Sequence, residues 1–106
     1  MFDVLEISLQ TISALREPLA VIRLEDADLY RQIRRAGSSI PLNIAEGSRR
    51  VGKDRKHLWR VAAGSAEEVR VALRTALAWG DVDGTQTSRS LELLDRVSAM
   101  LWKLTR

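Results

Sequence analysis

Six cationic side chains lie between positions 49 and 60 of this 106-residue chain, with a single acid, Asp54, among them. They are Arg49, Arg50, Lys53, Arg55, Lys56 and Arg60. Cations at this density are suited to binding phosphates, and a helix that starts near Asp54 adds free backbone N–H groups and a favourable dipole. The segment therefore indicates a phosphate-binding surface. A solvated charged end and a rim of ion pairs between subunits remain open as alternatives.

The charge of the whole chain is polarised around this segment. Residues 31–60 carry nine Lys and Arg against two acids, whereas the remaining chain is net negative and the total is +3. Such polarisation predicts one basic face or end that meets RNA, DNA or an acidic protein surface. No base-reading motif is present, so we expect phosphate-driven, salt-sensitive binding. Trp59 beside Arg60 is placed to stack on a base, but its apolar neighbours favour packing in the core.

Other chemistry finds little support in residue type and spacing. Residues 47–53 match the spacing of a nucleotide-binding P-loop, but Asp54 replaces the magnesium-binding Ser or Thr and no strand precedes the motif. Glu46, Glu67 and Glu68 do not complete a di-metal site, because the single histidine, His57, has no Glu three residues before it. The serines have no histidine–acid partners. We expect no enzyme activity, no metal and no cofactor.

Composition favours one soluble domain spanning residues 1–106. The chain has no cysteine, 45% hydrophobic and 29% charged residues. No apolar run approaches the ~20 residues that cross a bilayer. Acids near the N-terminus argue against a secretion signal, so we expect a cytoplasmic protein that does not bind membranes.

Helical periodicity predicts an all-α, antiparallel up-down-up-down four-helix bundle, kinked at Pro18 and Pro41. The four segments are about 3–24, 29–47, 55–79 and 85–104. Alternatively, the second helix ends near Ser39 and restarts at Pro41. We expect an acid of residues 25–28 to cap the second helix, Asp54 to cap the third, Gly80 to end it, and Thr85 or Thr87 to cap the fourth.

Each segment has an apolar stripe that we expect to face the core. The four stripes are Leu5, Leu9, Ile12, Leu15, Leu19 and Ile22; Leu29, Ile33, Ala36, Ile40, either Asn43 or Ile44, and Gly47; Leu58, Ala62, Ser65, Val69, Ala72, Ala76 and Trp79; and Leu91, Leu94, Val97, Leu101 and Leu104. Outside them lie Val4, Ile7, Val21, Leu42, Val61, Val71, Leu93 and Trp102. These residues either widen the stripes or form a second seam that faces another subunit, and both interpretations stay open.

Three sequence blocks stand out: QIRRA at 32–36, SIPLNIAEG at 39–47 and AGSAEE at 63–68. Together they resemble the bacterial four-helix family of 23S ribosomal RNA intervening-sequence proteins. The resemblance implies a left-handed four-helix bundle, assembly as a homopentamer and no enzymatic activity. A related accessory protein of diversity-generating retroelements binds a reverse transcriptase and nucleic acid through a basic pentameric surface. The chain departs from commoner members in its short acidic first connection and in Leu42.

Polar residues within these blocks are expected to hold the second and third helices together. The motif residues are Arg34, Arg35, Asn43, Glu46, Gly47, Gly64, Ser65 and Glu68. We expect Glu46 or Glu68 to pair with Arg34 or Arg35, or to bond Ser65 and Asn43. Two functions remain: a non-enzymatic oligomer, with five subunits favoured, that binds RNA or DNA, or a scaffold ring that recruits a protein such as a reverse transcriptase without touching nucleic acid.

Overall fold

Four α-helices make up nearly all of the chain in the computed structural model, which describes residues 2–106. They are α1 (Phe2–Glu25), α2 (Ala27–Ser48), α3 (Gly52–Trp79) and α4 (Gly84–Thr105). Residues 2–106 contain no β-strand. The predicted all-α four-helix bundle is confirmed, and no helix in this range is both long and apolar enough to span a membrane.

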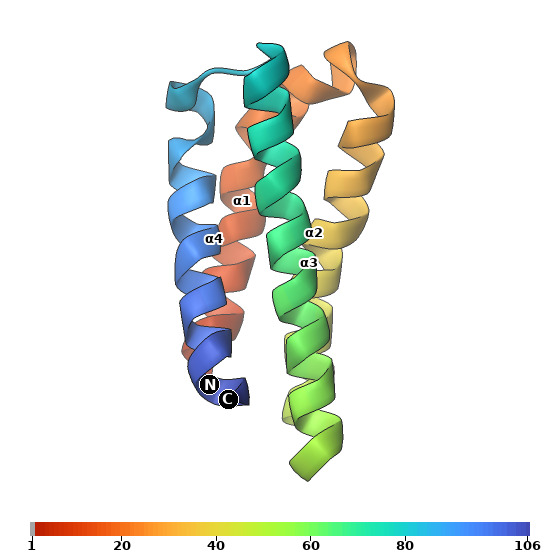
Figure 1. Ribbon diagram of the computed structural model, residues 1–106, viewed down its shortest axis with the longest axis vertical. Helices are drawn as coiled ribbons and strands as arrows, with labels where there is room; N and C mark the ends of the chain where they lie inside the picture. The colour runs from red at the N-terminus through yellow and green to blue at the C-terminus, as the bar shows by residue number, and fades with distance from the viewer. Residues whose placement is uncertain (1) are drawn as a thin grey trace.

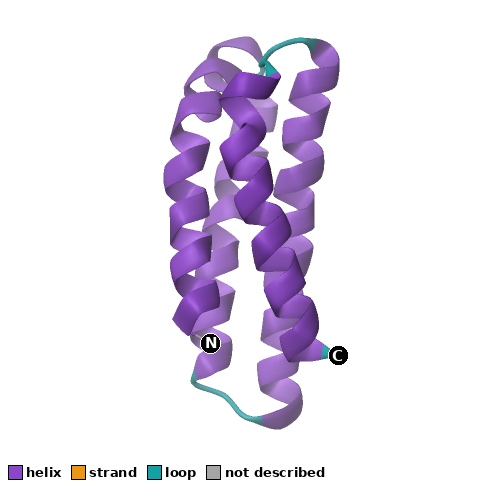
Figure 2. Cartoon of the chain, turned by 90° about the vertical axis from the view of Figure 1, so that its left-hand side faces the viewer, coloured by secondary structure: helices purple, strands orange, loops and turns teal. Residues whose placement is uncertain are grey.

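The helices form a closed ring of contacts along the length of the molecule. Each helix packs against its neighbours in the chain, and α4 closes the ring against α1. The molecule measures 42 × 22 × 19 Å, and α3, at 28 residues, matches its full length of about 42 Å. The turn between α2 and α3 lies at the same end as both chain termini, and the other two turns lie at the opposite end (Figure 1; Figure 2).

The core is lined by all four helices, and α2 follows its predicted stripe most closely. Ile33, Ala36, Ile40, Ile44 and Gly47 are all buried. The stripe predicted for α1 is wrong in part. Leu9 is 43% exposed, whereas Val4 and Ile7, which fell outside the stripe, are buried. Leu93 of α4 is likewise buried although it was placed outside.

The predicted seam of α3 fails at its C-terminal end, where Trp79 is 74% exposed. A strict seven-residue repeat drifts by about 20° per heptad around a straight helix, so residues three heptads apart leave the same face. The buried seam instead consists of Trp59, Ala62, Ala66, Val69, Ala72, Leu73 and Ala76. Trp59 therefore packs in the core, as expected.

Two of the four predicted helix boundaries differ in the structure. Asp26 caps α2 by accepting the N–H of Leu29, and Gly80 ends α3 in a left-handed conformation, as predicted. Asp54 does not cap α3, because the helix already starts at Gly52. Neither Thr85 nor Thr87 caps α4, since Asp83 does so in a capping box.

Both prolines lie inside continuous helices. Pro18 falls within α1 and Pro41 within α2. The alternative in which the second helix ends near Ser39 and restarts is therefore wrong. A bend at each proline stays a prediction, based on the backbone hydrogen bond that proline cannot donate.

Candidate nucleic-acid interface

The turn that carries the predicted basic residues projects beyond the rest of the bundle. It joins α2 to α3 through residues 49–51 and extends past both chain ends (Figure 1; Figure 2). Arg60 marks the level at which α4 stops, because its Nη2 donates to the carbonyl of Thr105 at 2.7 Å. Residues 52–59 of α3, about 12 Å of helix, therefore extend past α4.

Trp59 anchors this projecting turn. Its side chain is 5% exposed, and its Nε1 donates to the carbonyl of Ile44 in α2 at 3.1 Å. The indole lies so close to Gly47 that a Cβ there would be 2.6 Å from both Cδ1 and Nε1 of Trp59. The end of α2 and the start of α3 are thus held together by direct contact between the Trp59 indole and the backbone of Gly47.

Arg55 contributes to the same anchor. Its Nε donates to the carbonyl of Gly47 at 3.2 Å, and its Nη2 donates to that of Ser48 at 3.1 Å. The guanidinium also lies over the Trp59 ring, 5.4 Å from its centroid. Because the last carbonyls of a helix have no partner within that helix, Arg55 satisfies the C-terminus of α2 and balances its dipole. Arg60 does the same for α4 through Thr105.

Four cations of the predicted set remain at the surface of the turn. Arg50 pairs with Glu46 at 2.7 Å. Arg49, Lys53 and Lys56 are exposed, and in the described residues none of them forms an ion pair. We call these three residues the basic ledge. Their charge is not neutralised by a neighbouring carboxylate, so it is available to an external anion.

The start of α3 adds to the positive potential of the basic ledge. The N-cap residue, Val51, makes no capping hydrogen bond with its side chain. The first N–H groups of α3 therefore meet solvent beside Lys53, at the positive end of the longest helix in the bundle.

The motif residues of α2 and α3 meet across the interface of these two helices. Arg35 Nη2 lies 3.1 Å from Glu68 Oε2, which is one of the predicted pairings. Ser65 donates to the hydroxyl of Ser39 at 2.9 Å, and Asn43 donates to the same hydroxyl at 2.9 Å. These polar contacts thus join α2 to α3 across their shared interface.

Three motif residues take other places. Glu46 pairs with Arg50 in its own helix end and not with Arg34 or Arg35. Arg34 lines a pocket between α1 and α2 together with Arg16. Gly64 faces open space, because a Cβ placed there would meet no atom within 4 Å.

The acidic residues considered for metal binding are engaged or scattered. Arg70 holds Glu67 with two hydrogen bonds of 2.8 Å each, and this interaction lowers the pKa of Glu67 below its usual value. The described residues contain no group of three or more His, Asp or Glu side chains that could hold a metal. The segment with P-loop spacing runs from the end of α2 into α3.

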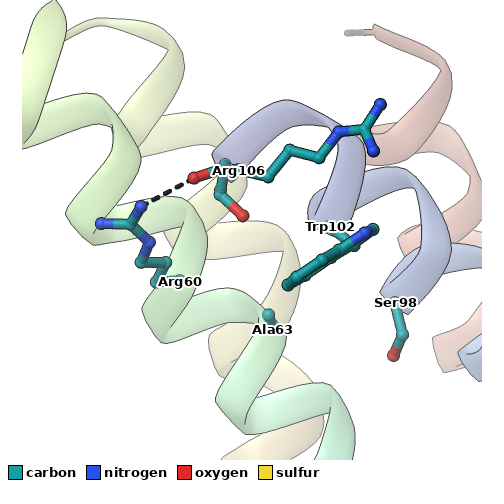
Figure 3. A pocket seen from close by; sticks show the side chains of 6 residues that line it. Arg60, Ala63, Ser98, Trp102 and Arg106 are labelled. Carbon is teal, nitrogen blue, oxygen red and sulfur yellow. Dashed lines mark hydrogen bonds between the residues drawn. The ribbon is translucent and has the colours of Figure 1, made fainter.

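A groove between α3 and α4 adjoins the basic ledge and was missed from the sequence. It encloses about 370 Å³ and is lined by Arg60, Ala63, Ser98, Trp102, Thr105 and Arg106 (Figure 3). Trp102 is 65% exposed there. The available signal was an indole outside every predicted stripe, near the C-terminal end of the last helix. That position could be related to Arg60 only once the two helices were placed side by side.

Comparisons with known proteins agree with this architecture. The sequence model described as "23S rRNA-intervening sequence protein" matches residues 5–103. The fold is similar to the crystal structure of a protein of unknown function from the S23 ribosomal protein family of Bacteroides thetaiotaomicron. That structure is 19% identical, with a TM-score of 0.85 over 97% of this chain and 98% of the other. No curated protein matches the sequence significantly.

Proposed function

Because the chain belongs to the family of 23S rRNA-intervening sequence proteins, we propose that it is a non-enzymatic protein that binds RNA or DNA through phosphate contacts at the basic ledge. The observation that carries this proposal is the unpaired state of Arg49, Lys53 and Lys56 on a turn that projects from the bundle. The same turn is anchored to the end of α2 by hydrogen bonds of Trp59 and Arg55, so the backbone that carries the cations is already ordered before a ligand binds.

The geometry of the ledge suits a phosphate backbone. Lys53 and Lys56 are three residues apart on α3 and therefore share one face, and Arg60 continues that face one turn further on. The rise from Lys53 to Arg60 is about 10 Å. A row of cations of this length can follow several phosphates of one strand, and such contacts carry no base information.

The direct test is binding by a variant that lacks the ledge. We expect Arg49→Ala/Lys53→Ala/Lys56→Ala to lose affinity for a labelled RNA hairpin and for duplex DNA about equally, measured by fluorescence anisotropy. The matched control is Arg31→Ala/Arg74→Ala/Arg89→Ala, which removes the same charge from exposed arginines elsewhere and should keep most of the affinity. If both variants lost affinity equally, binding would depend on the overall positive charge of the protein and not on the basic ledge. Unchanged binding by the ledge variant would favour a protein scaffold instead.

We also propose that the protein self-associates through the outer face of α2 and α3. Leu42 is 67% exposed, and Val61 and Val71 are exposed on the neighbouring helix. Val61, Gly64 and Val71 fall on one face of α3, where Gly64 leaves open space for a close approach. Exposed apolar side chains along neighbouring helices are typical of protein–protein contacts, and the family resemblance favours five copies.

Light scattering tests this second part of the proposal. We expect Leu42→Glu/Val71→Glu to lower the molar mass while the helical circular dichroism signal is kept, because buried carboxylates would oppose association. Trp79→Glu, at an exposed residue at the far end of α3, is the control and should leave the mass unchanged. A wild-type protein that stays monomeric at micromolar concentration would overturn self-association.

A further inference from the structure

We infer that the groove between α3 and α4 binds an unpaired base of a single-stranded nucleic acid, with the indole of Trp102 as the stacking surface. The inference rests on the proposed phosphate binding at the basic ledge and adds to it a preference for single strands. It gives a role to a large aromatic side chain that the core does not use.

The first support is the state of Trp102 itself. It is 65% exposed, in contrast to Trp59, which is buried and donates its Nε1 hydrogen to Ile44. Within residues 2–106 the indole N–H of Trp102 has no hydrogen-bond partner, so both the ring face and this donor are available. Exposed aromatic faces stack on bases of any identity because every base has a π-face.

The second support is the arrangement of the groove. Figure 3 shows the guanidinium of Arg60 and the indole of Trp102 on opposite sides of Ala63, whose small side chain leaves the floor open. Arg60 donates one hydrogen bond to the carbonyl of Thr105, and its other N–H groups can still donate to a phosphate. The side chain of Arg106 extends away from the other two, so we assign it no contact (Figure 3).

The third support is continuity with the basic ledge. Lys53, Lys56, Arg60 and Ala63 follow one another at steps of three, four and three residues, which keeps them on one face of α3. Because α4 stops at the level of Arg60, this face leads without interruption from the exposed lysines into the groove. A strand whose phosphates lie along the lysines reaches Trp102 at its next positions. A duplex keeps its bases paired and stacked, and cannot insert one without unpairing it.

The test compares two strands that carry the same phosphates. One is an oligothymidylate of about 12 nucleotides, and the other has the same length but only abasic sites, within the range of known single-strand site sizes. We expect the wild type to bind the base-bearing strand roughly 5- to 100-fold more tightly. Trp102→Ala should remove that difference and leave affinity for the abasic strand unchanged. The affinity is then lost only when both the indole and the bases were present, which shows that the two interact.

Matched variants separate stacking from other effects. Trp79→Ala removes another exposed indole, 74% exposed against 65% for Trp102, at the opposite end of the bundle and should keep the full difference between the strands. Ala63→Leu should fill the floor of the groove and reduce the difference without removing any charge. Fluorescence of Trp79→Phe, in which Trp102 is the remaining exposed indole, should be quenched by the base-bearing strand alone.

The possible failures are distinguishable. If the wild type binds both strands equally, base stacking is wrong although phosphate binding stands. If Trp102→Ala weakens both strands to the same extent, or changes the molar mass, Trp102 belongs to a contact between copies of the chain and the inference is overturned. If neither strand binds at low salt, the proposed function fails and this inference fails with it.

Discussion

Gly47 and Trp59 are the pair of residues on which the shape of the basic end depends. The indole is buried against the last turn of α2 and bonds the carbonyl of Ile44 there. A rigid ring in this place cannot rotate away from an added methyl group in the way that a flexible side chain can. The glycine in the block SIPLNIAEG is therefore required by close packing.

We predict that Gly47→Ala destabilises the protein by about 1–3 kcal/mol, because its Cβ would overlap the Trp59 ring. Thermal unfolding measures the effect, and each kcal/mol corresponds to about 4–8 °C in Tm for a domain near this size. The matched control is Gly84→Ala in the first turn of α4, where an added Cβ meets no atom within 4 Å and should raise stability by up to about 0.5–1 kcal/mol through higher helix propensity. A pair of shifts with the same sign would contradict this assignment of the two glycines.

At the scale of the helix, the start of α4 offers an equally sharp comparison. Asp83 accepts the N–H of Gln86 at 2.9 Å, and Gln86 in return accepts the N–H of Asp83 at 3.0 Å. We predict that Asp83→Ala costs about 1 kcal/mol of stability through loss of this capping box. Thr85→Ala, at the exposed one of the two threonines that the sequence offered as caps, should shift the denaturant midpoint by little. If Thr85→Ala proved the more damaging change, the helix would begin later than the structure shows.

The helices also show why apolar periodicity predicted the buried face of α2 correctly but not that of α1. The buried face of α1 includes Ser8 and Thr11, both fully buried, whose hydroxyls donate to the carbonyls of Leu5 and Ile7. A hydroxyl that bonds its own helix can enter a core at little cost. A stripe drawn through apolar residues alone passes over such positions and selects Leu9 instead. In α2 no buried hydroxyl competes, so its apolar residues mark the core correctly.

The same limit applies to the candidate site. The number and order of the helices, the turn between α2 and α3 and the density of cations there could all be predicted from the sequence. The engagement of Arg55 and Arg60 could not, because their partners are carbonyls and Thr105 lies 45 residues away from Arg60. Only the folded chain separates arginines that cap helices from cations that remain available to a ligand.

At the scale of the whole molecule, the two ends of the 42 Å bundle differ in charge. The two turns at the end remote from the basic ledge can be located in Figure 1. They hold the acids Glu25, Asp26, Asp28, Asp81 and Asp83, although Arg23 and Arg31 lie beside the first of these turns and Arg31 pairs with Asp28. We therefore expect the end with the basic ledge to attract a polyanion more strongly than the opposite end does.

The most direct test of the central claim is the salt dependence of wild-type binding to RNA and to DNA. The three contacts of the basic ledge contribute about −2 to the slope of log K against log salt for a single strand and about −2.7 for a duplex, for each bound site. The ledge variant that lacks Arg49, Lys53 and Lys56 should flatten the slope by about these amounts, with the remainder due to other cations such as Arg60. Binding that is absent at low salt, or a slope that the ledge variant leaves unchanged, would contradict the assignment of the basic ledge as the phosphate-binding surface.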